Sequence, residues 1–347
     1  MSPTTGKRVL VTGLGTFWGA RVAQALEADP EVEVIVGLDR EEPKLPLERT
    51  EYVRADESYS ILSRIVKAAR IDTIVHTFLV VDSTQMSNRS LHEINVIGTM
   101  NLLAAAGAPG STVRTVVVKS STLVYGAAPE DPVWFKEEMS RSRRPRTRVE
   151  QSLLEVEDYL RDFAEENPHV TVTLLRFSNV LGPDIATPLR KALEMPVVPQ
   201  VFGFDPRFQF VHETDVVRAI LFVLQGRVQG IYNVAGDGLL PWSEVAAICG
   251  KRTIPLPPVG VGLLSGPLGR IGIELPPELL GLLRHGRGVD NRRLKQVGFE
   301  YRFTSAGTVV DFVEALRIKK TVGETTPGYQ YERDVEQFFR HSPAVLE

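Results

Sequence analysis

The chain has 347 residues, of which 43% are hydrophobic and 24% charged, so it can bury a large core and is not disordered by composition. Its net charge of -3 provides no basic field for nucleic acid, and no apolar run reaches membrane-spanning length. These properties exclude nucleic-acid binders and proteins with an integral membrane segment. With Cys249 as its only cysteine and no signal-peptide pattern at its start, the chain is expected to be cytoplasmic, without disulfides or a metal site.

Short apolar strand patterns alternate with helical patterns through the first half of the chain. The strand patterns are continuous blocks of Val, Ile and Leu, which are typical of parallel strands buried on both faces. In chain order, the segments are residues 8–13, 19–28, 33–39, 61–70, 72–79, 93–107 and 114–121. This alternation predicts an α/β fold of the Rossmann type, with a doubly wound parallel sheet.

The rhythm changes in the second half. After a helical pattern at 152–166 and a strand pattern at 170–180, proline density rises from Gly182 onward, and patterns at 209–225 and 230–236 indicate a return to the sheet. We expect three parts: a Rossmann domain of residues 1–181, 209–236 and about 288–318; a smaller C-terminal substrate lobe of residues 182–208 and 237–287; and a tail of residues 319–347 with a short helix.

A glycine-rich stretch, TGLGTFWG, follows the first predicted strand and precedes a predicted helix. Gly13, Gly15 and Gly19 would let the chain turn tightly and let a pyrophosphate approach the backbone at the positive end of the helix. Asp39 closes the next strand, 20 residues after Gly19 (39 minus 19), where a carboxylate binds ribose hydroxyls and repels a 2′-phosphate. The pattern favours NAD over NADP, although Arg40 weakens that preference. The alternative is a glycine turn that packs helix on strand without a ligand.

Further stretches extend this pattern along nearly the whole chain: RAD at 54–56, IVHTFL at 74–79, NVIGTMNLLAAA at 95–106, SSTLVYG at 120–126, LLRFSNVLGP at 174–183 and FVHETDVVRAI at 210–220. With them the chain resembles the extended short-chain dehydrogenase/reductases, the NAD-dependent epimerase/dehydratase family, and within it a group of actinobacterial proteins named after UDP-glucose epimerase. The resemblance implies an NAD-dependent oxidoreductase or isomerase that acts on a small molecule. It also implies a homodimer formed through the helices at 95–107 and 152–160.

The resemblance further implies roles for individual residues. Ser121 matches the family's catalytic serine or threonine, which hydrogen-bonds the substrate oxygen. The implied cofactor-binding residues are Thr16, Phe17 and Trp18 beside the glycines, Asp56 near the adenine, His76, Thr77 and Phe78 after the fourth strand, Asn95, Ser120, and Phe177 and Asn179 beside the nicotinamide. Each of these residues also has a purely structural interpretation.

The stretch RTRVEQSLLE at 146–155 departs from the family pattern. The family places a tyrosine there with a lysine four residues later, so that the ammonium lowers the pKa of the phenol that accepts the substrate proton. Here the tyrosine position falls on Thr147 and the lysine position on Gln151, and none of the eight tyrosines of the chain has a lysine four residues later. Neither replacement can act as the missing base.

Other residues are candidates for that role. Lys119 lies two residues before Ser121 on a predicted strand and would share its face, where burial would lower the pKa of the amine. Its structural alternative is an ion pair with a carboxylate at the end of the sheet. Tyr125 is a second candidate, although packing is its usual role in the family.

The substrate is less clearly indicated by the sequence. In nucleotide-sugar enzymes of the family an arginine holds the diphosphate, but this chain has Phe208 at that position. The candidate substrate residues are Arg207, His212, Arg284 and Arg287. The apolar lobe sequence is compatible with an apolar hydroxyl or keto substrate, or with a small core of its own.

Two functions from different classes therefore remain open. One is an epimerase/dehydratase-like oxidoreductase with a rearranged acid/base site. The other is a catalytically inactive NAD-binding sensor or scaffold protein, which the loss of the tyrosine and lysine favours.

Overall fold

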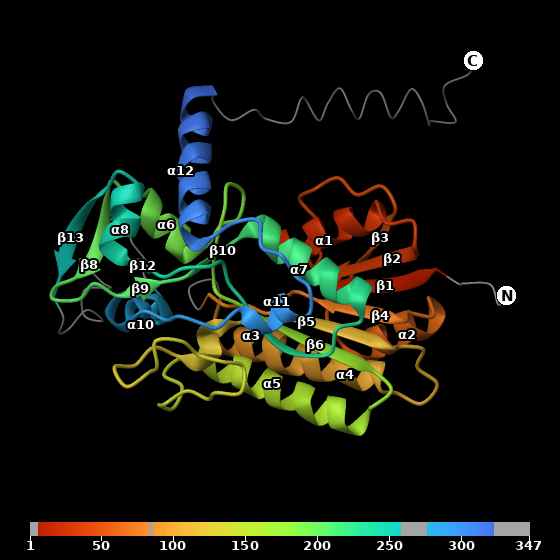
Figure 1. Cartoon of the computed structure of the whole chain (residues 1–347). Coiled ribbons are helices and arrows are strands. Elements are labelled where there is room, and N and C mark those ends of the chain that lie inside the picture. Colours follow the sequence, from red (N-terminus) through yellow and green to blue (C-terminus); the bar gives the residue numbers. More distant parts are fainter. Residues whose placement is uncertain (1–5, 83–85, 258–275, 323–347) are drawn as a thin grey trace, which may run out of the picture.

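The structure, a computed structural model, describes residues 6–82, 86–257 and 276–322 (Figure 1). The expected tail at 319–347 begins as the end of a long helix, and its residues from 323 onward lie outside the described ranges.

One parallel sheet of seven strands forms the centre of the molecule, in the order β11-β6-β5-β4-β1-β2-β3. Its strands are β1 (Lys7–Thr12), β2 (Val32–Asp39), β3 (Thr50–Arg54), β4 (Thr73–His76), β5 (Thr115–Ser121), β6 (Thr171–Phe177) and β11 (Gly230–Val234). The chain leaves β1 toward one edge and crosses back to β4 for the other, which is the doubly wound topology. The predicted Rossmann-type fold is confirmed.

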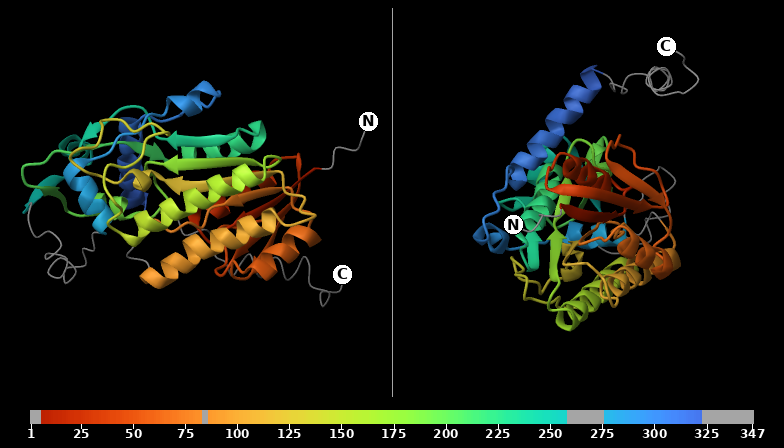
Figure 2. Two further views of the ribbon diagram at one scale, coloured as in Figure 1. Left: turned by 90° about the horizontal axis from the view of Figure 1, so that it is seen from below. Right: turned by 90° about the vertical axis from the view of Figure 1, so that its right-hand side faces the viewer.

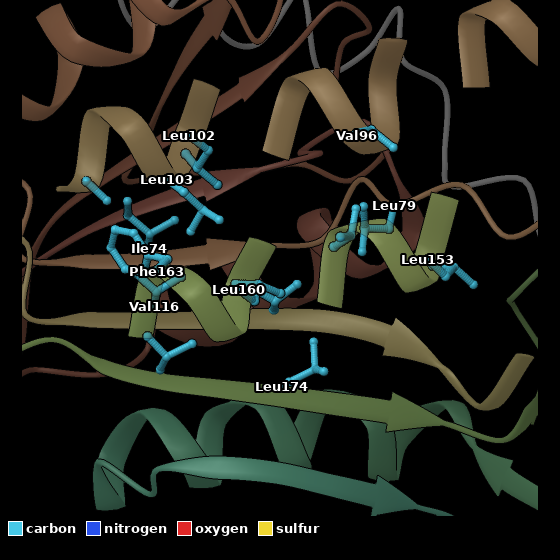
Figure 3. Packing of buried hydrophobic residues seen from close by; sticks show 14 of the residues in the cluster. Ile74, Leu79, Val96, Leu102, Leu103, Val116, Leu153, Leu160, Phe163 and Leu174 are labelled. Carbon is cyan, nitrogen blue, oxygen red and sulfur yellow. The ribbon is translucent and has the colours of Figure 1, made fainter. Parts of the chain in front are cut away.

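Helices cover both faces of this sheet (Figure 1). They are α1 (Phe17–Glu27), α2 (Tyr59–Ala68), α3 (Asn88–His92), the π-helix η1 (Glu93–Gly98), α4 (Thr99–Ala106), the short 3-10 helix η2 (Thr122–Tyr125), α5 (Arg148–Glu166), α7 (Glu213–Gly226) and α11 (Arg292–Gln296). One apolar layer packs α2, α4 and α5 against the sheet, and Leu102, Leu160 and Val116 belong to its cluster of buried side chains (Figure 3). The other layer packs α1 and α7 on the opposite face.

The remaining elements form a lobe beyond the carboxyl ends of the strands, toward which the arrowheads of the sheet point (Figure 2). They are β7 (Asn179–Leu181), α6 (Pro188–Glu194), β8 (Val197–Val201), β9 (Arg207–Phe208), β10 (Phe210–His212), β12 (Leu240–Pro241), α8 (Trp242–Ile248), β13 (Arg252–Leu256), α10 (Pro277–His285) and α12 (Ser305–Val322). They have a hydrophobic core of their own, centred on Phe208, Phe210 and Trp242.

Helix α12 belongs to the core of this lobe. Its buried side chains pack in the same cluster as Trp242; they are Val309, Phe312 and Val313. The sequence predicted that residues up to about 318 belong to the Rossmann domain. An amphipathic pattern predicts that a helix buries one face, but it does not say against which unit. The exact division of the chain into domains stays a prediction.

None of the helices within the described ranges has both the length and the apolar character needed to cross a membrane.

Candidate functional site

A cavity of about 700 Å³ lies between the carboxyl ends of the strands and the lobe. Its walls come from the loops after β1 and β4, from the ends of β5 and β6, and from α6 and α10. Of the residues predicted for the site, those that line it are Gly15, Thr16, Phe17, Trp18, Thr77, Phe78, Lys119, Ser120, Ser121, Phe177, Asn179 and Arg287. In a doubly wound sheet this edge is where ligands bind, and the volume suits a cofactor with room for a second small molecule.

The glycine loop forms one end of the cavity because no side chain fits at its tightest points. Gly13 has φ +80°, and a Cβ on Gly19 would lie 2.1 Å from the carbonyl oxygen of Gly13. Thr16 caps α1, since its hydroxyl accepts a hydrogen bond from the N–H of Gly19 at 3.1 Å. The amino end of α1 therefore faces the cavity with the partial positive charge that suits a pyrophosphate.

Asp39 lies at the end of β2, beside this loop. Its carboxylate accepts hydrogen bonds from the N–H of Gly15 at 2.9 Å and of Glu41 at 3.1 Å. Arg40 is directed toward Glu57, with 3.9 Å between the charged groups, and Asp56 is exposed at the start of α2. Asp39 does not itself line the cavity, but its carboxylate is held against the glycine loop, where a ribose bound next to that loop would meet it.

The segment after β4 lines the cavity through Thr77 and Phe78, but His76 points elsewhere. The His76 ring is fully buried, with Nδ1 2.9 Å from the Thr12 hydroxyl and Nε2 2.9 Å from the Thr99 hydroxyl. Burial, with a smaller effect of Lys119, lowers the pKa of His76 to about 3. The ring is therefore neutral and holds β1, β4 and α4 together.

Asn95, in the π-helix, fixes the same segment from behind. Its side-chain amide donates to the carbonyl of Val80 at 2.9 Å and accepts from the N–H of Val80 at 2.8 Å. It also donates to the hydroxyl of Ser152 on α5 at 3.1 Å. Asn95 therefore positions a wall of the cavity and does not itself line it.

Lys119 and Ser121 line the cavity from the end of β5. The Lys119 ammonium is buried, donates to the carbonyl of Leu79 at 3.1 Å, and lies 5.6 Å from the centre of the Trp18 ring. Among the described residues it has no carboxylate partner, so the ion pair considered as its structural alternative is not formed there. Burial lowers the pKa of Lys119 to about 8, because the ammonium loses its hydration.

Ser120 and Tyr125 join a buried polar network behind the cavity. Arg176 on β6 and Glu157 on α5 form an ion pair with a nitrogen–oxygen distance of 2.5 Å, and both side chains are less than one tenth exposed. Ser120 donates to Glu157 at 2.9 Å, and Arg176 donates to the Tyr125 hydroxyl at 2.7 Å. That hydroxyl donates in turn to Asn233 at 2.8 Å.

Tyr125 is thereby committed to structure. Burial raises the pKa of its hydroxyl despite the neighbouring Arg176, so the phenol stays protonated at neutral pH. Glu157 and Arg176 were not among the predicted site residues, although an arginine inside a strand as apolar as VTVTLLRF is a sign of a buried acidic partner.

Thr147 and Gln151 serve the start of α5. Thr147 is the N-cap residue, and its hydroxyl accepts from the N–H of Glu150 at 3.2 Å. Gln151 donates to Glu155 at 2.8 Å and accepts from Arg148 at 2.9 Å. Neither residue lines the large cavity.

The four candidate substrate residues are not gathered in one place. Arg207 is exposed on β9, and His212 caps α7 while its Nε2 lies 3.0 Å from a carboxylate oxygen of Asp311. Arg284 lines a second, smaller cavity, and Arg287 lines both cavities. Only Arg287 therefore reaches the cavity that also contains Lys119 and Ser121.

The residues in and beside the wall of the large cavity fit a dinucleotide. The glycine loop and the amino end of α1 suit a pyrophosphate, Asp39 suits a ribose, and the hydroxyl of Ser178 in the wall is buried without a hydrogen-bond partner among the described residues. The part of the wall that α6 and α10 supply was not predicted from the sequence. No local motif signals it, because it depends on how the lobe packs on the sheet.

Comparison with known proteins gives a consistent pattern. Residues 9–235 match the model of the NAD dependent epimerase/dehydratase family. An uncharacterized protein of Mycobacterium tuberculosis is 33% identical over 319 residues, which are 89% of this chain and 84% of that protein. UDP-glucose 4-epimerase 2 of Oryza sativa is 28% identical over 191 residues, which are 51% of this chain and 45% of that protein.

Solved structures share the fold. MoeE5 in complex with UDP-glucuronic acid and NAD has a TM-score of 0.69 at 22% identity, over 89% of this chain and 99% of that chain. UDP-glucose 4-epimerase of Thermotoga maritima with UDP-glucose has a TM-score of 0.69 at 20% identity, over 91% of this chain and 99% of that chain.

The buried ion pair leads to a prediction about stability. Replacing Glu157 by Leu leaves the Arg176 guanidinium buried without a counter-charge, and we expect the free energy of unfolding to fall by about 3 to 5 kcal/mol. The double change Glu157→Leu with Arg176→Met should recover most of that loss. Urea denaturation followed by circular dichroism measures both, with the exposed Asp158→Asn as a control expected to change stability by less than about 0.5 kcal/mol. A Glu157→Leu protein as stable as the wild type would contradict the role given to the pair.

Proposed function

The chain belongs to the NAD-dependent epimerase/dehydratase family, and from this premise we propose that it binds NAD in the large cavity and uses it on the hydroxyl or keto group of a small molecule. One observation carries the proposal: a single cavity joins the glycine loop to Lys119 and Ser121 and to the lobe. A site built only to hold a dinucleotide would not need an ionisable group and a second lobe at its far end.

The chemistry divides between the cofactor and the chain. NAD, when bound, supplies the hydride acceptor. The chain must orient the substrate hydroxyl and remove its proton. The Ser121 hydroxyl is placed to hydrogen-bond the substrate oxygen, and the Lys119 amine, uncharged above its pKa of about 8, is placed to accept the proton.

With this arrangement, the proposed chemistry requires no base at positions 147 and 151, where Thr147 and Gln151 lie. The family's tyrosine works with a lysine that lowers the pKa of the phenol, whereas burial alone lowers the pKa of the Lys119 amine to about 8. The acid/base group would then lie on the sheet, at the end of β5, and α5 would keep only its structural role.

We propose NAD as the cofactor in preference to NADP. The Asp39 carboxylate at the rim favours ribose hydroxyls and repels a 2′-phosphate, and Arg40 is turned toward Glu57. The substrate is proposed to be a nucleotide sugar or a more apolar hydroxyl or keto compound, since MoeE5 and the Thermotoga epimerase were solved with UDP-glucuronic acid and UDP-glucose, respectively.

The second candidate is a catalytically inactive NAD-binding sensor or scaffold. The hydrogen bonds of Thr147 and Gln151 within α5 favour it, because both side chains stabilise the start of the helix. The two candidates differ in whether bound cofactor is reduced and reoxidised by a substrate.

We also propose a homodimer and a cytoplasmic location. Three apolar side chains on η1, α4 and α5 are between 37% and 42% exposed: Ile97, Met100 and Tyr159. Met100 and Tyr159 line a groove between α4 and α5. Pairing these helices with those of a second copy would bury that apolar surface. Cys249, which forms no disulfide, suits a reducing compartment.

Lys119→Met tests the proposed base. With UDP-glucose or another accepted substrate, we expect turnover to fall by about 10² to 10⁴ while NAD binding stays within about twofold. In the wild type, the rate of alcohol oxidation should rise as pH increases through about 8, because the amine must lose its proton. Lys119→Arg, which keeps the charge but cannot deprotonate at these pH values, separates a base from a fixed charge. Undiminished turnover in both variants would remove Lys119 from the chemistry, and cofactor binding with no turnover in the wild type would favour the sensor.

Asp39→Asn tests the cofactor preference. The amide can still accept a hydrogen bond from the N–H of Gly15, but it lacks the negative charge. We therefore expect NAD to bind about tenfold more weakly and the preference for NAD over NADP to decrease. Calorimetric titration with each dinucleotide measures both, and Glu42→Gln is the matched control on the neighbouring exposed loop. An unchanged ratio would show that Asp39 does not select the cofactor.

Met100→Glu tests the proposed dimer. Two charges would be buried at the contact, so the mass measured by sedimentation should fall from that of two chains to that of one. Val133→Glu, which adds the same charge at a residue 62% exposed outside α4 and α5, should leave the dimer intact. A wild-type protein that sediments as a monomer would refute the homodimer.

A further inference from the structure

Beyond β7, the lobe contributes two segments to the wall of the large cavity. One leads into the start of α6, and the other extends from just before α10 to just after it. Most of the residues with which these segments line the cavity are apolar, among them Ile185, Pro188, Leu189, Pro276, Leu279 and Leu282. This part of the wall therefore offers a ligand more hydrocarbon surface than hydrogen-bonding groups.

Two polar side chains of the first segment are bonded within the protein. The Asp184 carboxylate pairs with the guanidinium of Arg21 on α1 at 2.9 Å. The Thr187 hydroxyl caps α6, where it accepts a hydrogen bond from the N–H of Arg190 at 3.1 Å. A ligand that needed these two groups would have to compete with partners that the fold already supplies.

The charge of these two segments does not favour an anion. Within the described ranges their acidic lining residues are Asp184 and Glu278 and their basic one is Arg287, which gives a formal charge of -1 (one minus two). The Arg287 guanidinium donates to the carbonyl of Gly126 at 2.7 Å, and Gly126 lines the smaller cavity and not the large one. A group with several negative charges would meet net repulsion from this wall.

Strand β9 adds no cation to the large cavity. Phe208 occupies the position at which the sequence pattern of nucleotide-sugar enzymes has an arginine, and its ring is fully buried, with its centre 4.6 Å from that of Trp242. Arg207, the residue before it, is exposed and lines neither cavity. The strand therefore stabilises the core of the lobe and does not serve a charged ligand.

The wall is also apolar next to the proposed reactive groups. The Lys119 ammonium donates to the carbonyl of Leu79 at 3.1 Å, and Leu79 and Val80 line the cavity after β4. Leu123, which also lines it, follows Ser121 by two residues. Hydrocarbon side chains thus lie on both sides of the place where a substrate oxygen would be held.

We propose that the large cavity takes an apolar substrate, a secondary alcohol or ketone on an uncharged hydrocarbon chain or ring. Its oxygen would lie at Ser121 and Lys119, and its hydrocarbon part would pack against β7, α6 and α10. Burial of hydrocarbon stabilises such a complex in proportion to the apolar area removed from water, and it needs no counter-charge. A nucleotide sugar would instead bring a diphosphate and many hydroxyls to a wall that is mostly apolar.

This inference deepens the proposed function and rests on it for the reaction. In the direction of oxidation, the alcohol gives its hydroxyl proton to the Lys119 amine and a hydride to NAD, and it becomes the ketone. The binding of the hydrocarbon part needs only the apolar wall, so it can be measured without turnover.

The first test measures how affinity depends on chain length, with the alcohols from butan-2-ol to octan-2-ol as probes. Binding is followed by NMR titration into the NADH-saturated protein, in which the alcohol cannot be oxidised. Each added methylene should strengthen binding about fourfold until the apolar wall is covered. UDP-glucose should not displace octan-2-ol. Affinity that is independent of chain length, or displacement by UDP-glucose, would overturn the proposal.

The second test changes the wall. Leu279→Gln puts an amide into it at nearly the same volume, and we expect octan-2-ol to bind at least about tenfold more weakly, with NADH binding within about twofold. The matched control is Leu280→Gln, since the next residue of α10 lines the smaller cavity instead and should leave octan-2-ol binding within about twofold. Equal losses in the two variants would assign the effect to damage of α10 and refute the site.

Val180→Thr keeps the test decisive if circular dichroism shows that Leu279→Gln does not fold. Val180 lines the cavity from β7 and is half-buried, and threonine has the same shape, so this variant should fold and bind octan-2-ol about threefold more weakly. Undiminished binding in every folded variant of the wall would refute the site.

Turnover measured with NAD separates this inference from the proposed function. If the alcohols bind with the expected dependence on chain length but neither they nor UDP-glucose are oxidised, the apolar site stands and the proposed chemistry fails. If UDP-glucose is turned over and the alcohols do not bind, the proposed function stands and the apolar site fails.

Discussion

The ion pair between Arg176 and Glu157 fixes the part of the structure on which both cavities depend. It ties β6 to α5 in a buried setting, where neither charge can be left alone. Ser120 donates to the same carboxylate and Tyr125 accepts from the same guanidinium, so the end of β5 and the turn after it are held in register. Ser121 and Lys119 line the large cavity, and Gly126 lines the smaller one.

The hydrogen bonds around this network and at the start of α5 limit which side chains could act on a substrate. Because Tyr125 and Ser120 are held by buried charges, they are not free to act on a substrate. Thr147 and Gln151 are engaged in capping and in side-chain bonds along the helix. Lys119 is an ionisable group in the cavity wall, two residues before Ser121, and burial lowers its pKa to about 8. This is the physical basis of the rearranged acid/base site that we propose.

Electrostatics divide the two cavities into different environments. The glycine loop, the start of α1 and Asp39 meet the needs of a dinucleotide with partial charges and one carboxylate. The smaller cavity is lined by more positive than negative side chains, among them Arg146, Arg284 and Arg287 against Glu150 and Glu278. Arg287 lines both cavities.

The sequence by itself determined the alternation of elements, the glycine loop with Asp39, and the absence of the tyrosine and lysine, because each is a local pattern set by backbone geometry or by residue identity. It could not show that the His76 ring hydrogen-bonds to Thr12 and Thr99. Nor could it show that Lys119 donates to a backbone carbonyl and not to a carboxylate. Only the tertiary structure decided these points, because they depend on contacts between segments far apart in the chain: β1 with β4, Gly126 with Arg287, and α10 with the start of α5.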